Sequence, residues 1–343
     1  MLTQRTEKEI SQQIKLVLLD EFNNQNRKGL YAYTQKSMAY NSNKIEGSTL
    51  TSEQTASLFD TGEFVSNGVE VYRAKDVEEM NGHFKMFNEM LKRINEPLSP
   101  DLIKIYHYQL KSGVFEDIAN GYPIGEYKNR ANTVSDITVA KPSEVPQMMQ
   151  KLIDEYNSSN KTLKDITRFH AEYENIHPFQ DGNGRTGRII IFKQCIDSEL
   201  IPVIVKDKDK AFYIRALHKA QTENDYNDLI NIFEKSQKEY GQKAFDYIEG
   251  YKKQSPLMEN TWLEFVNLSR EEKRDGIEWN GQKMRLAVFE DMYLAQCGKE
   301  GREPLKEISD HFWKVCVEIN EYKPNFCKRI NGEQGSSADD YNR

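Results

Sequence analysis

The amino-acid sequence predicts a mainly α-helical fold with one short β element and a small C-terminal accessory unit. Apolar residues recur every three or four positions over most of the first 252 residues, which is the period of an amphipathic helix. Only residues 133–139 alternate in polarity and are rich in β-branched side chains, as strands are. A Gln-Ser-Pro stretch at 254–256 follows a long polar helical pattern and indicates a domain boundary.

Residues 7–40 have a helical pattern. A second periodic stretch ends near Gly47, and glycine commonly stops helices. Thr51 and Gln54 have the spacing of a capping box, so the next helix should begin between them. Glycine and proline at 121–125 precede the predicted strand or hairpin. Further helical patterns cover residues 70–95, 101–113, 143–156, 161–174, 184–198 and 209–252.

Three segments follow from these boundaries. Residues 1–254 form the large helical domain, with its core at about 35–250. Residues 255–330 form an accessory module that contains all three tryptophans of the chain. Residues 331–343 are rich in Gly, Ser, Asp and Asn, a composition that predicts a disordered tail.

The composition is that of a soluble protein with a formal charge of −7, which argues against broad non-specific binding to nucleic acid. The N-terminus lacks an apolar signal core and every apolar run is too short for a membrane helix, so we expect a cytoplasmic protein. Cys195 follows an apolar run and is expected to be a buried thiol. The other three cysteines could bind zinc only together with His311, and their spacings fit no common zinc pattern. They are Cys297, Cys316 and Cys327.

Residues 177–188, with the sequence HPFQDGNGRTGR, combine a base, a carboxylate, a glycine turn and two arginines directly before an apolar helical run. His177 precedes a proline, so we expect extended backbone there, and its imidazole is a usable base near neutral pH. Asp181 offers the hard oxygen that Mg²⁺ prefers. The glycine turn leads into a helix N-terminus, where free backbone amides bind anions. The pattern predicts a phosphate site with a base beside it.

Each of these residues also has an ordinary structural interpretation. A single histidine is more often a core residue, and an aspartate before glycine is common in turns. Two arginines at the positive end of a helix are unfavourable for each other and for the helix dipole, by about 0.3–1 kcal/mol each. An anionic ligand or a carboxylate partner for Arg185 and Arg188 would remove that conflict.

The twelve residues resemble the signature of the Fic family at every defining position, and the similarity extends over roughly residues 35–250. The family resemblance implies transfer of AMP from ATP, with Mg²⁺, to a Ser, Thr or Tyr hydroxyl of a target protein. It makes His177 the general base and Asp181 the metal ligand. It implies that the predicted β element is a β-hairpin flap that aligns the target protein. The resemblance implies that ATP is bound by the signature residues Gly182, Asn183, Gly184, Arg185, Thr186, Gly187 and Arg188. It also places the nucleotide near the flap residues Val134, Ser135, Asp136 and Ile137, and the adenine near Tyr213. Glycine at 184 favours nucleotidyl transfer over phosphate transfer.

Ser42, Glu46 and Gly47 resemble the inhibitory motif of self-inhibited Fic proteins, in which the glutamate pairs with the second signature arginine, here Arg188. The resemblance therefore implies a helix, ending near Gly47, that keeps ATP from binding productively. The alternative is an ordinary helix end with an exposed glutamate. Three other functions stay open: removal of AMP from a modified target, a non-catalytic Fic scaffold that regulates by binding, and use of another nucleotide or phosphocholine donor.

The accessory module has three candidate roles. Residues 305–310 fit the start of a helix-turn-helix, but the module carries more acidic than basic residues, so DNA is an unlikely partner. Oligomerisation with copies of the same chain, or recognition of the target protein, agrees better with this composition. Self-modification stays open, and no membrane partner is expected.

Overall fold

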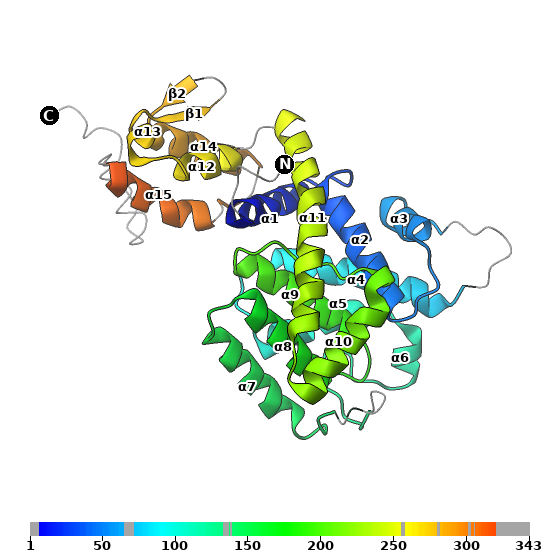
Figure 1. The fold of residues 1–343 in the computed structure, drawn as a ribbon. Helices are drawn as coiled ribbons and strands as arrows, with labels where there is room; N and C mark the ends of the chain where they lie inside the picture. Colours follow the sequence, from blue (N-terminus) through cyan, green and yellow to red (C-terminus); the bar gives the residue numbers. More distant parts are fainter. Residues whose placement is uncertain are drawn as a thin grey trace. The chain divides into compact units, whose positions relative to one another are not determined.

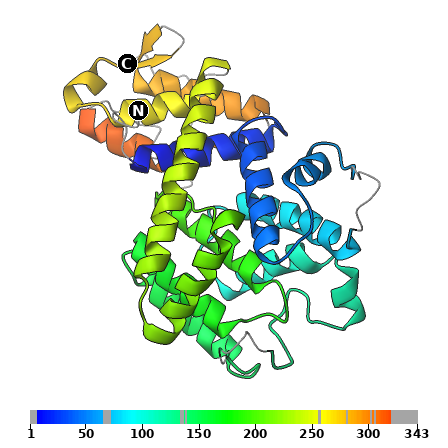
Figure 2. The same cartoon turned by 45° about the vertical axis from the view of Figure 1, so that its right-hand side comes forward.

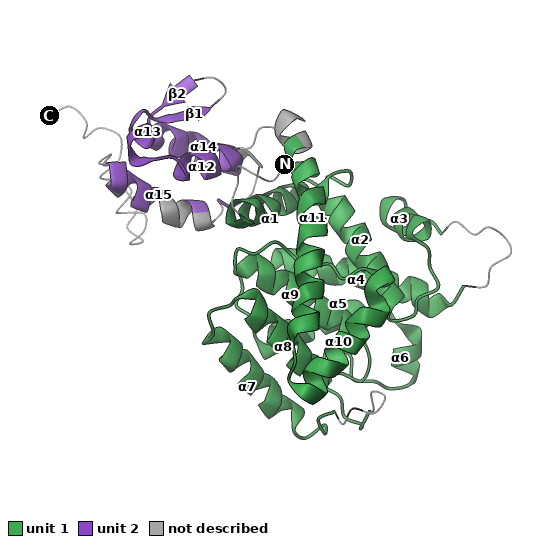
Figure 3. Ribbon diagram, in the orientation of Figure 1, with its two compact units in different colours: residues 1–250 green, residues 251–343 purple. Residues whose placement is uncertain are grey.

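The structure is a computed structural model, and it describes residues 7–64, 72–132, 137, 139–254, 258–279, 282–300, 303–304 and 306–319 (Figures 1 and 2). It divides into two compact units, residues 1–250 and 251–343 (Figure 3). Helices dominate the first unit, and the second adds a two-stranded sheet, so the predicted mainly α fold is confirmed. In the described part of the chain, no helix combines the length and apolar character that crossing a membrane requires.

The first unit consists of helices around a buried central helix. Its elements are α1 (Glu7–Asn23), α2 (Leu30–Ile45), α3 (Ser52–Asp60), α4 (Ala74–Lys92), α5 (Pro100–Lys111), α6 (Phe115–Ala119), α7 (Val145–Asn157), α8 (Leu163–Ile176), α9 (Asn183–Asp197), the 3₁₀ turn η1 (Asp207–Asp209), α10 (Lys210–Glu223) and α11 (Asn227–Gln254).

Helix α9 lies at the centre of this unit because it carries four consecutive apolar residues, which cover all sides of the helix. Ile189, Ile190, Ile191 and Phe192 are all at most 1% exposed. Helices α1, α2, α4, α5 and α8 all contact α9, which therefore packs as a core helix rather than a surface one (Figure 1). The residues at its N-terminal end are consequently held on a rigid element.

Two predicted helices are each interrupted once. The expected helix at 7–40 ends at Asn23, and α2 begins at Leu30, because the polar run between them has no core positions and Gln25 adopts a left-handed φ of 54°. The expected helix at 209–252 divides into α10 and α11 at Asn224, which has a φ of 58°. Asparagine tolerates this conformation and commonly ends helices. The capping box of α3 is confirmed, since both Thr51 and Gln54 side chains bond the expected backbone amides.

The second unit contains α12 (Met258–Val266), α13 (Arg270–Arg274), β1 (Ile277–Trp279), β2 (Gln282–Met284), α14 (Leu286–Glu300) and α15 (Lys306–Ile319). Strands β1 and β2 pair antiparallel, with Ile277 opposite Met284. Trp262 stacks on Phe312, with ring centroids 4.0 Å apart, in an apolar core of its own. Cys297 and Cys316 are buried in that core, as Cys195 is buried in the first unit. The residues 331–343 that were expected to be disordered lie outside the described residues.

Candidate active site

The predicted base lies at the end of α8. His177 caps this helix with a left-handed backbone, φ 52° and ψ 62°, and its N–H donates to the Tyr173 carbonyl at 3.0 Å. The expectation of extended backbone was therefore wrong. Proline at 178 disfavours the right-handed helical region for the preceding residue, and the left-handed conformation satisfies that restriction while it also terminates the helix. The chain consequently turns at His177 itself into the loop that carries the other site residues.

The loop after His177 is fixed from several sides. The Asn183 side chain accepts from the Phe179 N–H at 2.8 Å and donates to the Phe179 carbonyl at 2.9 Å, which closes the turn. The buried Phe179 ring stacks on His107, with centroids 3.9 Å apart and planes 1° from parallel. The Lys128 N–H donates to the Pro178 carbonyl at 2.8 Å. The side-chain amide of Asn183 thus serves the loop itself, and the expected contact of this residue with ATP stays a prediction.

The imidazole of His177 is neutral at physiological pH. Burial, with a smaller contribution from the Lys128 cation, lowers the pKa of His177 to about 4. An imidazole that is unprotonated across the physiological range can accept a proton from a hydroxyl group. The charge state is therefore the one that a general base requires.

The Asp181 carboxylate is the candidate metal ligand. Burial alone would raise the pKa of Asp181, but Arg185 and Lys111 outweigh it and hold the pKa well below its ordinary value. Its Oδ2 accepts from Lys111 Nζ at 2.8 Å, and its Oδ1 accepts from the Gly182 N–H at 2.7 Å. The side chain is 35% exposed. An ionised, partly open carboxylate fits Mg²⁺, which takes one or two protein carboxylates and keeps its other positions for water and phosphate.

The N-terminus of α9 presents the anion-binding amides. Gly182 takes the N-cap position with a φ of 84°, which glycine adopts without strain. Asn183, Gly184 and Arg185 form the first turn, whose amides have no carbonyl one turn earlier to bond. Thr186 is fully buried, and a Cβ added at Gly187 would lie 2.6 Å from Glu174 of α8. These last two residues therefore line the α8–α9 contact.

Both signature arginines have carboxylate partners, which resolves the conflict at the helix start. Arg188 Nη2 lies 2.6 Å from Glu46 Oε1, and its guanidinium also donates to the Ser42 Oγ at 2.8 Å and the Ser42 carbonyl at 3.0 Å. Arg185 pairs with Glu79 and, at 3.4 Å, with Asp181. Partial loss of hydration would raise the pKa of Glu46, but Arg188 and Arg185 hold it below its ordinary value. Glu46 is thus an ionised carboxylate over the helix N-terminus.

The segment that carries Glu46 is tethered to the start of α4. Arg73 Nη2 donates to the Gly47 carbonyl at 2.6 Å and forms an ion pair with Asp76 at 2.8 Å. The Asp76 carboxylate accepts from both the N–H and the hydroxyl of Thr49, at 2.8 and 2.6 Å. Gly47 follows the helix with a φ of 90°. We call Arg73 and Asp76 the α4 tether, because together they fix the turn after Glu46.

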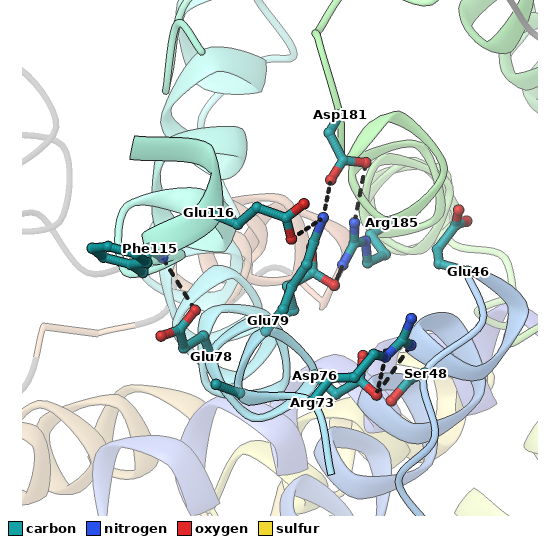
Figure 4. Close-up of a pocket in the computed structure, with 12 residues that line it drawn as sticks. Glu46, Ser48, Arg73, Asp76, Glu78, Glu79, Phe115, Glu116, Asp181 and Arg185 are labelled. Carbon is teal, nitrogen blue, oxygen red and sulfur yellow. Dashed lines mark hydrogen bonds and ion pairs between the residues drawn. The ribbon is translucent and has the colours of Figure 1, made fainter. Parts of the chain in front are cut away.

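A cavity of about 630 Å³ opens beside these groups. Asp181 and Arg185 line it from the signature loop and α9, and Glu46 and Ser48 line it from the segment after α2 (Figure 4). In this view Asp181 and Glu79 both point toward Arg185. A ligand in the cavity would contact the metal-ligand candidate and the Glu46 carboxylate together. The remaining lining residues are Arg73, Ala74, Lys75, Asp76, Glu78, Phe115 and Glu116.

The positions outside the signature are less completely described. Tyr213 is buried, and its hydroxyl lies 2.6 Å from His170 Nε2. Its contact with adenine stays a prediction. Val134, Ser135 and Asp136 lie outside the described residues, whereas Ile137 forms an isolated β-bridge. The flap therefore also stays a prediction.

Sequence reasoning missed Lys111, Glu79 and the α4 tether. Apart from the ion pair between Arg73 and Asp76, their contacts join residues far apart in the chain, which local patterns do not indicate. One signal was present: Lys111 follows His107 by four residues, so both side chains share one helix face. His107 Nε2 lies 3.0 Å from the Asp181 carbonyl, and the pair holds Asp181 from one helix.

Comparison with known proteins agrees with this geometry. The protein adenylyltransferase Fic of Nematostella vectensis is 27% identical over 187 residues, which cover 53% of this chain and 42% of that protein. The protein adenylyltransferase fic-1 of Caenorhabditis elegans is 28% identical over 188 residues, which cover 53% of this chain and 35% of that protein. The matched part thus spans less than half the length of these relatives.

Solved structures show the same fold. A Fic domain containing signaling protein from Bacteroides thetaiotaomicron superposes with a TM-score of 0.56 at 24% identity, covering 69% of this chain and 97% of that one. Fic-1 from Caenorhabditis elegans superposes with a TM-score of 0.51 at 22% identity, covering 72% of this chain and 74% of that one. The model of the Fic/DOC family matches residues 97–195, which include α5, α8 and the whole signature. Residues 97–195 of this chain are therefore similar to the Fic/DOC family, and the signature lies within that range.

Proposed function

We propose that the protein is a self-inhibited protein adenylyltransferase, which moves AMP from ATP to a Ser, Thr or Tyr hydroxyl of a target protein. The observation that carries the proposal is the convergence of a neutral imidazole, an ionised carboxylate and a helix N-terminus in residues 177–188. The names of the curated relatives, protein adenylyltransferases, supply the reaction class. The ion pair between Glu46 and Arg188 supplies the inhibition.

The reaction uses these residues as follows. The target hydroxyl transfers its proton to His177, and its oxygen forms a new bond to the α-phosphorus of ATP. The bond from that phosphorus to the bridging oxygen breaks, and pyrophosphate leaves. The amides at the start of α9 and the Arg185 guanidinium stabilise the negative charge on the phosphates. Positioning and charge stabilisation dominate such phosphorus chemistry.

Mg²⁺ would be held by Asp181, and when bound it neutralises charge on the α- and β-phosphates. The chain's own contribution is the ionised carboxylate and its two fixed oxygens. Glu46 opposes the reaction, because it occupies the Arg188 guanidinium that the γ-phosphate would otherwise bind. ATP then enters without its outer phosphate anchored and is held unproductively.

Removal of AMP from a modified target is the second candidate function. The Glu46 carboxylate is ionised, and its side chain is 36% exposed toward the cavity. A carboxylate in that position can accept a proton from a water molecule that attacks the phosphorus. A non-catalytic scaffold has less support, because such a protein needs neither a neutral imidazole nor an ionised Asp181 in one loop.

The test is to incubate the full chain and its Glu46→Gly variant with Mg²⁺, ATP labelled at the α-phosphate and a cell lysate. We expect the variant to attach label to protein, and mass spectrometry of labelled bands to find AMP on hydroxyl side chains. Absence of label from the variant would contradict adenylyl transfer. Release of AMP from pre-modified protein by the unchanged chain, but not by the variant, would favour the second function.

The α4 tether predicts a second way to weaken the inhibition. Arg73→Ala removes the bond to the Gly47 carbonyl and one partner of Asp76, while Glu46 itself stays in place. We expect AMP transfer to rise about fivefold, the equivalent of about 1 kcal/mol for one such hydrogen bond. Initial rates with labelled ATP measure this. Arg93→Ala, which removes the ion pairs with Glu89 and Glu96 at the other end of α4, is the matched control. Equal rates for both variants would contradict the tether.

The charge of His177 predicts the pH dependence of the reaction. Because its pKa is lowered to about 4, the imidazole stays unprotonated while the pH falls through 6.5, where an ordinary histidine gains its proton. The kcat/KM of the Glu46→Gly variant should therefore show no loss attributable to His177 between about pH 8 and pH 5, and should fall only near pH 4. If kcat/KM falls with a midpoint near pH 6.5, while the affinity for an ATP analogue does not change over the same range, this charge state is contradicted.

A further inference from the structure

The buried ammonium of Lys111 lies among three carboxylates. Its Nζ is 2.6 Å from Glu79, 2.6 Å from Asp117 and 2.8 Å from Asp181, and its side chain is 2% exposed. A lysine ammonium has three N–H donors and no acceptor. It donates to Glu79 and Asp181, and Asp117 completes the set as an ion-pair partner, so three carboxylates fix the ammonium at one point.

This ammonium connects two groups that the proposed reaction needs. Asp181 is one of its partners, and Glu79, the second, forms the ion pair with Arg185. One helical turn earlier on α5, His107 Nε2 lies 3.0 Å from the Asp181 backbone carbonyl. Helix α5 thus holds Asp181 by its backbone and by its carboxylate, and it reaches Arg185 through Glu79.

The three carboxylates would repel one another without a cation between them. Their oxygens all lie within 4.8 Å of one another, a spacing that a metal ion could also occupy. Lys111 is the cation that pairs with all three from within the chain, and α5 sets its position. Lys75 lies 3.5 Å from the same Asp181 oxygen, and Arg185 pairs with Glu79. Asp181 consequently has one oxygen, Oδ2, directed to Lys111, while the opposite oxygen accepts from the Gly182 N–H at 2.7 Å. The plane of the carboxylate is therefore set before any ligand arrives.

We propose that Lys111 is a positioning residue of this site, a built-in cation that holds Asp181 and, through Glu79, Arg185 in the arrangement that binds a metal–nucleotide complex. The inference rests on the proposed function, since it concerns the binding of that same nucleotide. Lys111 acts through its partners and is not assigned a contact with the substrate. Its effect should accordingly be larger for the nucleotide with metal than for the nucleotide alone, because Asp181 contacts phosphate only through the metal.

The test is calorimetric titration of full-length Glu46→Gly protein with α,β-methylene-ATP, once with Mn²⁺ and once in EDTA. Adding Lys111→Met keeps the length of the side chain and removes its charge. We expect the dissociation constant with Mn²⁺ to rise about tenfold, the usual effect of losing a group that orients a metal ligand. In EDTA the rise should be at most about threefold, because only the path through Glu79 and Arg185 remains.

Lys193→Met is the matched control. Lys193 is a fully buried lysine of α9, which pairs with Asp197 at 2.8 Å and donates to the Ile94 carbonyl at 2.8 Å, so its removal also leaves a carboxylate without its cation. This variant should lose thermal stability while its dissociation constants stay within about twofold of the parent. Equal rises for Lys111→Met with Mn²⁺ and in EDTA, or an equal rise for Lys193→Met, would overturn the proposal.

Three further outcomes are informative. If Lys111→Met does not fold, the double variant Lys111→Met/Asp117→Asn removes one of the stranded charges, and the same titrations apply to it. If the Glu46→Gly parent binds the analogue and Lys111→Met binds it equally well, the role of Lys111 is wrong while the proposed function stands. If the parent binds no analogue with or without Mn²⁺, the proposed function is wrong and the role of Lys111 with it.

Discussion

The Glu46→Gly variant is expected to transfer AMP between about tenfold and a hundredfold faster than the unchanged chain. In the unchanged chain, Arg188 must give up a carboxylate at 2.6 Å before it can bind a phosphate. A hydrogen bond to a charged group contributes about 1.5–3 kcal/mol, and each 1.4 kcal/mol corresponds to a factor of ten. Glycine removes the carboxylate at the C-cap of α2, outside the helix interior, where glycine would destabilise the helix. Initial rates with labelled ATP at equal protein concentration measure the gain.

Glu46→Gln separates the charge of this side chain from its size. Glutamine can still accept a hydrogen bond from Arg188, but it lacks the negative charge that competes with phosphate. Its rate should therefore lie between those of the unchanged chain and the glycine variant. Self-inhibition by Glu46 would be contradicted if the unchanged chain and Glu46→Gly labelled protein at equal rates.

Local patterns predicted the elements whose causes are local. The capping box at Thr51 and Gln54 requires only residues three apart, and both of its bonds are present. The strand pair at 277–284 was missed although the sequence carries Asn-Gly at 280–281, the strongest short signal for a hairpin. Its three-residue strands are too short to show alternation. That error was one of interpretation, since the signal was in the chain.

The support of the site could not be predicted, because its contacts cross the chain. Asp181 and Lys111 are 70 residues apart, and no periodicity relates them. The conflict between Arg185 and Arg188 did indicate that an anion was required, but it could not say whether a ligand or a carboxylate would provide it. The folded chain brings Glu79 to the first arginine, a pair that nothing in the sequence indicated, and Glu46 to the second, the pair that the family resemblance implied.

The backbone of His177 shows a different limit. The rule for a residue before proline excludes the right-handed helix but leaves two other regions open. Extended backbone is the more common of the two, so it was expected. The left-handed conformation occurs because the same residue also ends α8 with a bond to Tyr173. Where two local rules act on one residue, the sequence does not say which solution satisfies both.

His177→Ala, made in the Glu46→Gly background, is expected to reduce AMP transfer by about a hundredfold or more, since a general base contributes about 10²–10⁴. Binding of α,β-methylene-ATP with Mn²⁺ should stay within about twofold of the parent, because Asp181, the amides of α9 and Arg188 are unchanged. His218→Ala, on α10 outside the site, is the control. Loss of binding together with transfer would indicate that His177 shapes the loop rather than accepting the proton.

The size of this loss tests how the hydroxyl is activated. A base with a pKa of about 4 is much weaker than an ordinary imidazole, so it can withdraw little proton density from a hydroxyl before the oxygen reaches phosphorus. Such a base suffices only if attack precedes proton transfer, as in a loose transition state where bond formation to the nucleophile lags behind departure of pyrophosphate. In that case the loss lies near the lower end of the range. A loss near 10⁴ would instead require the bound target and nucleotide to raise the pKa of His177, which the kcat profile against pH would then report.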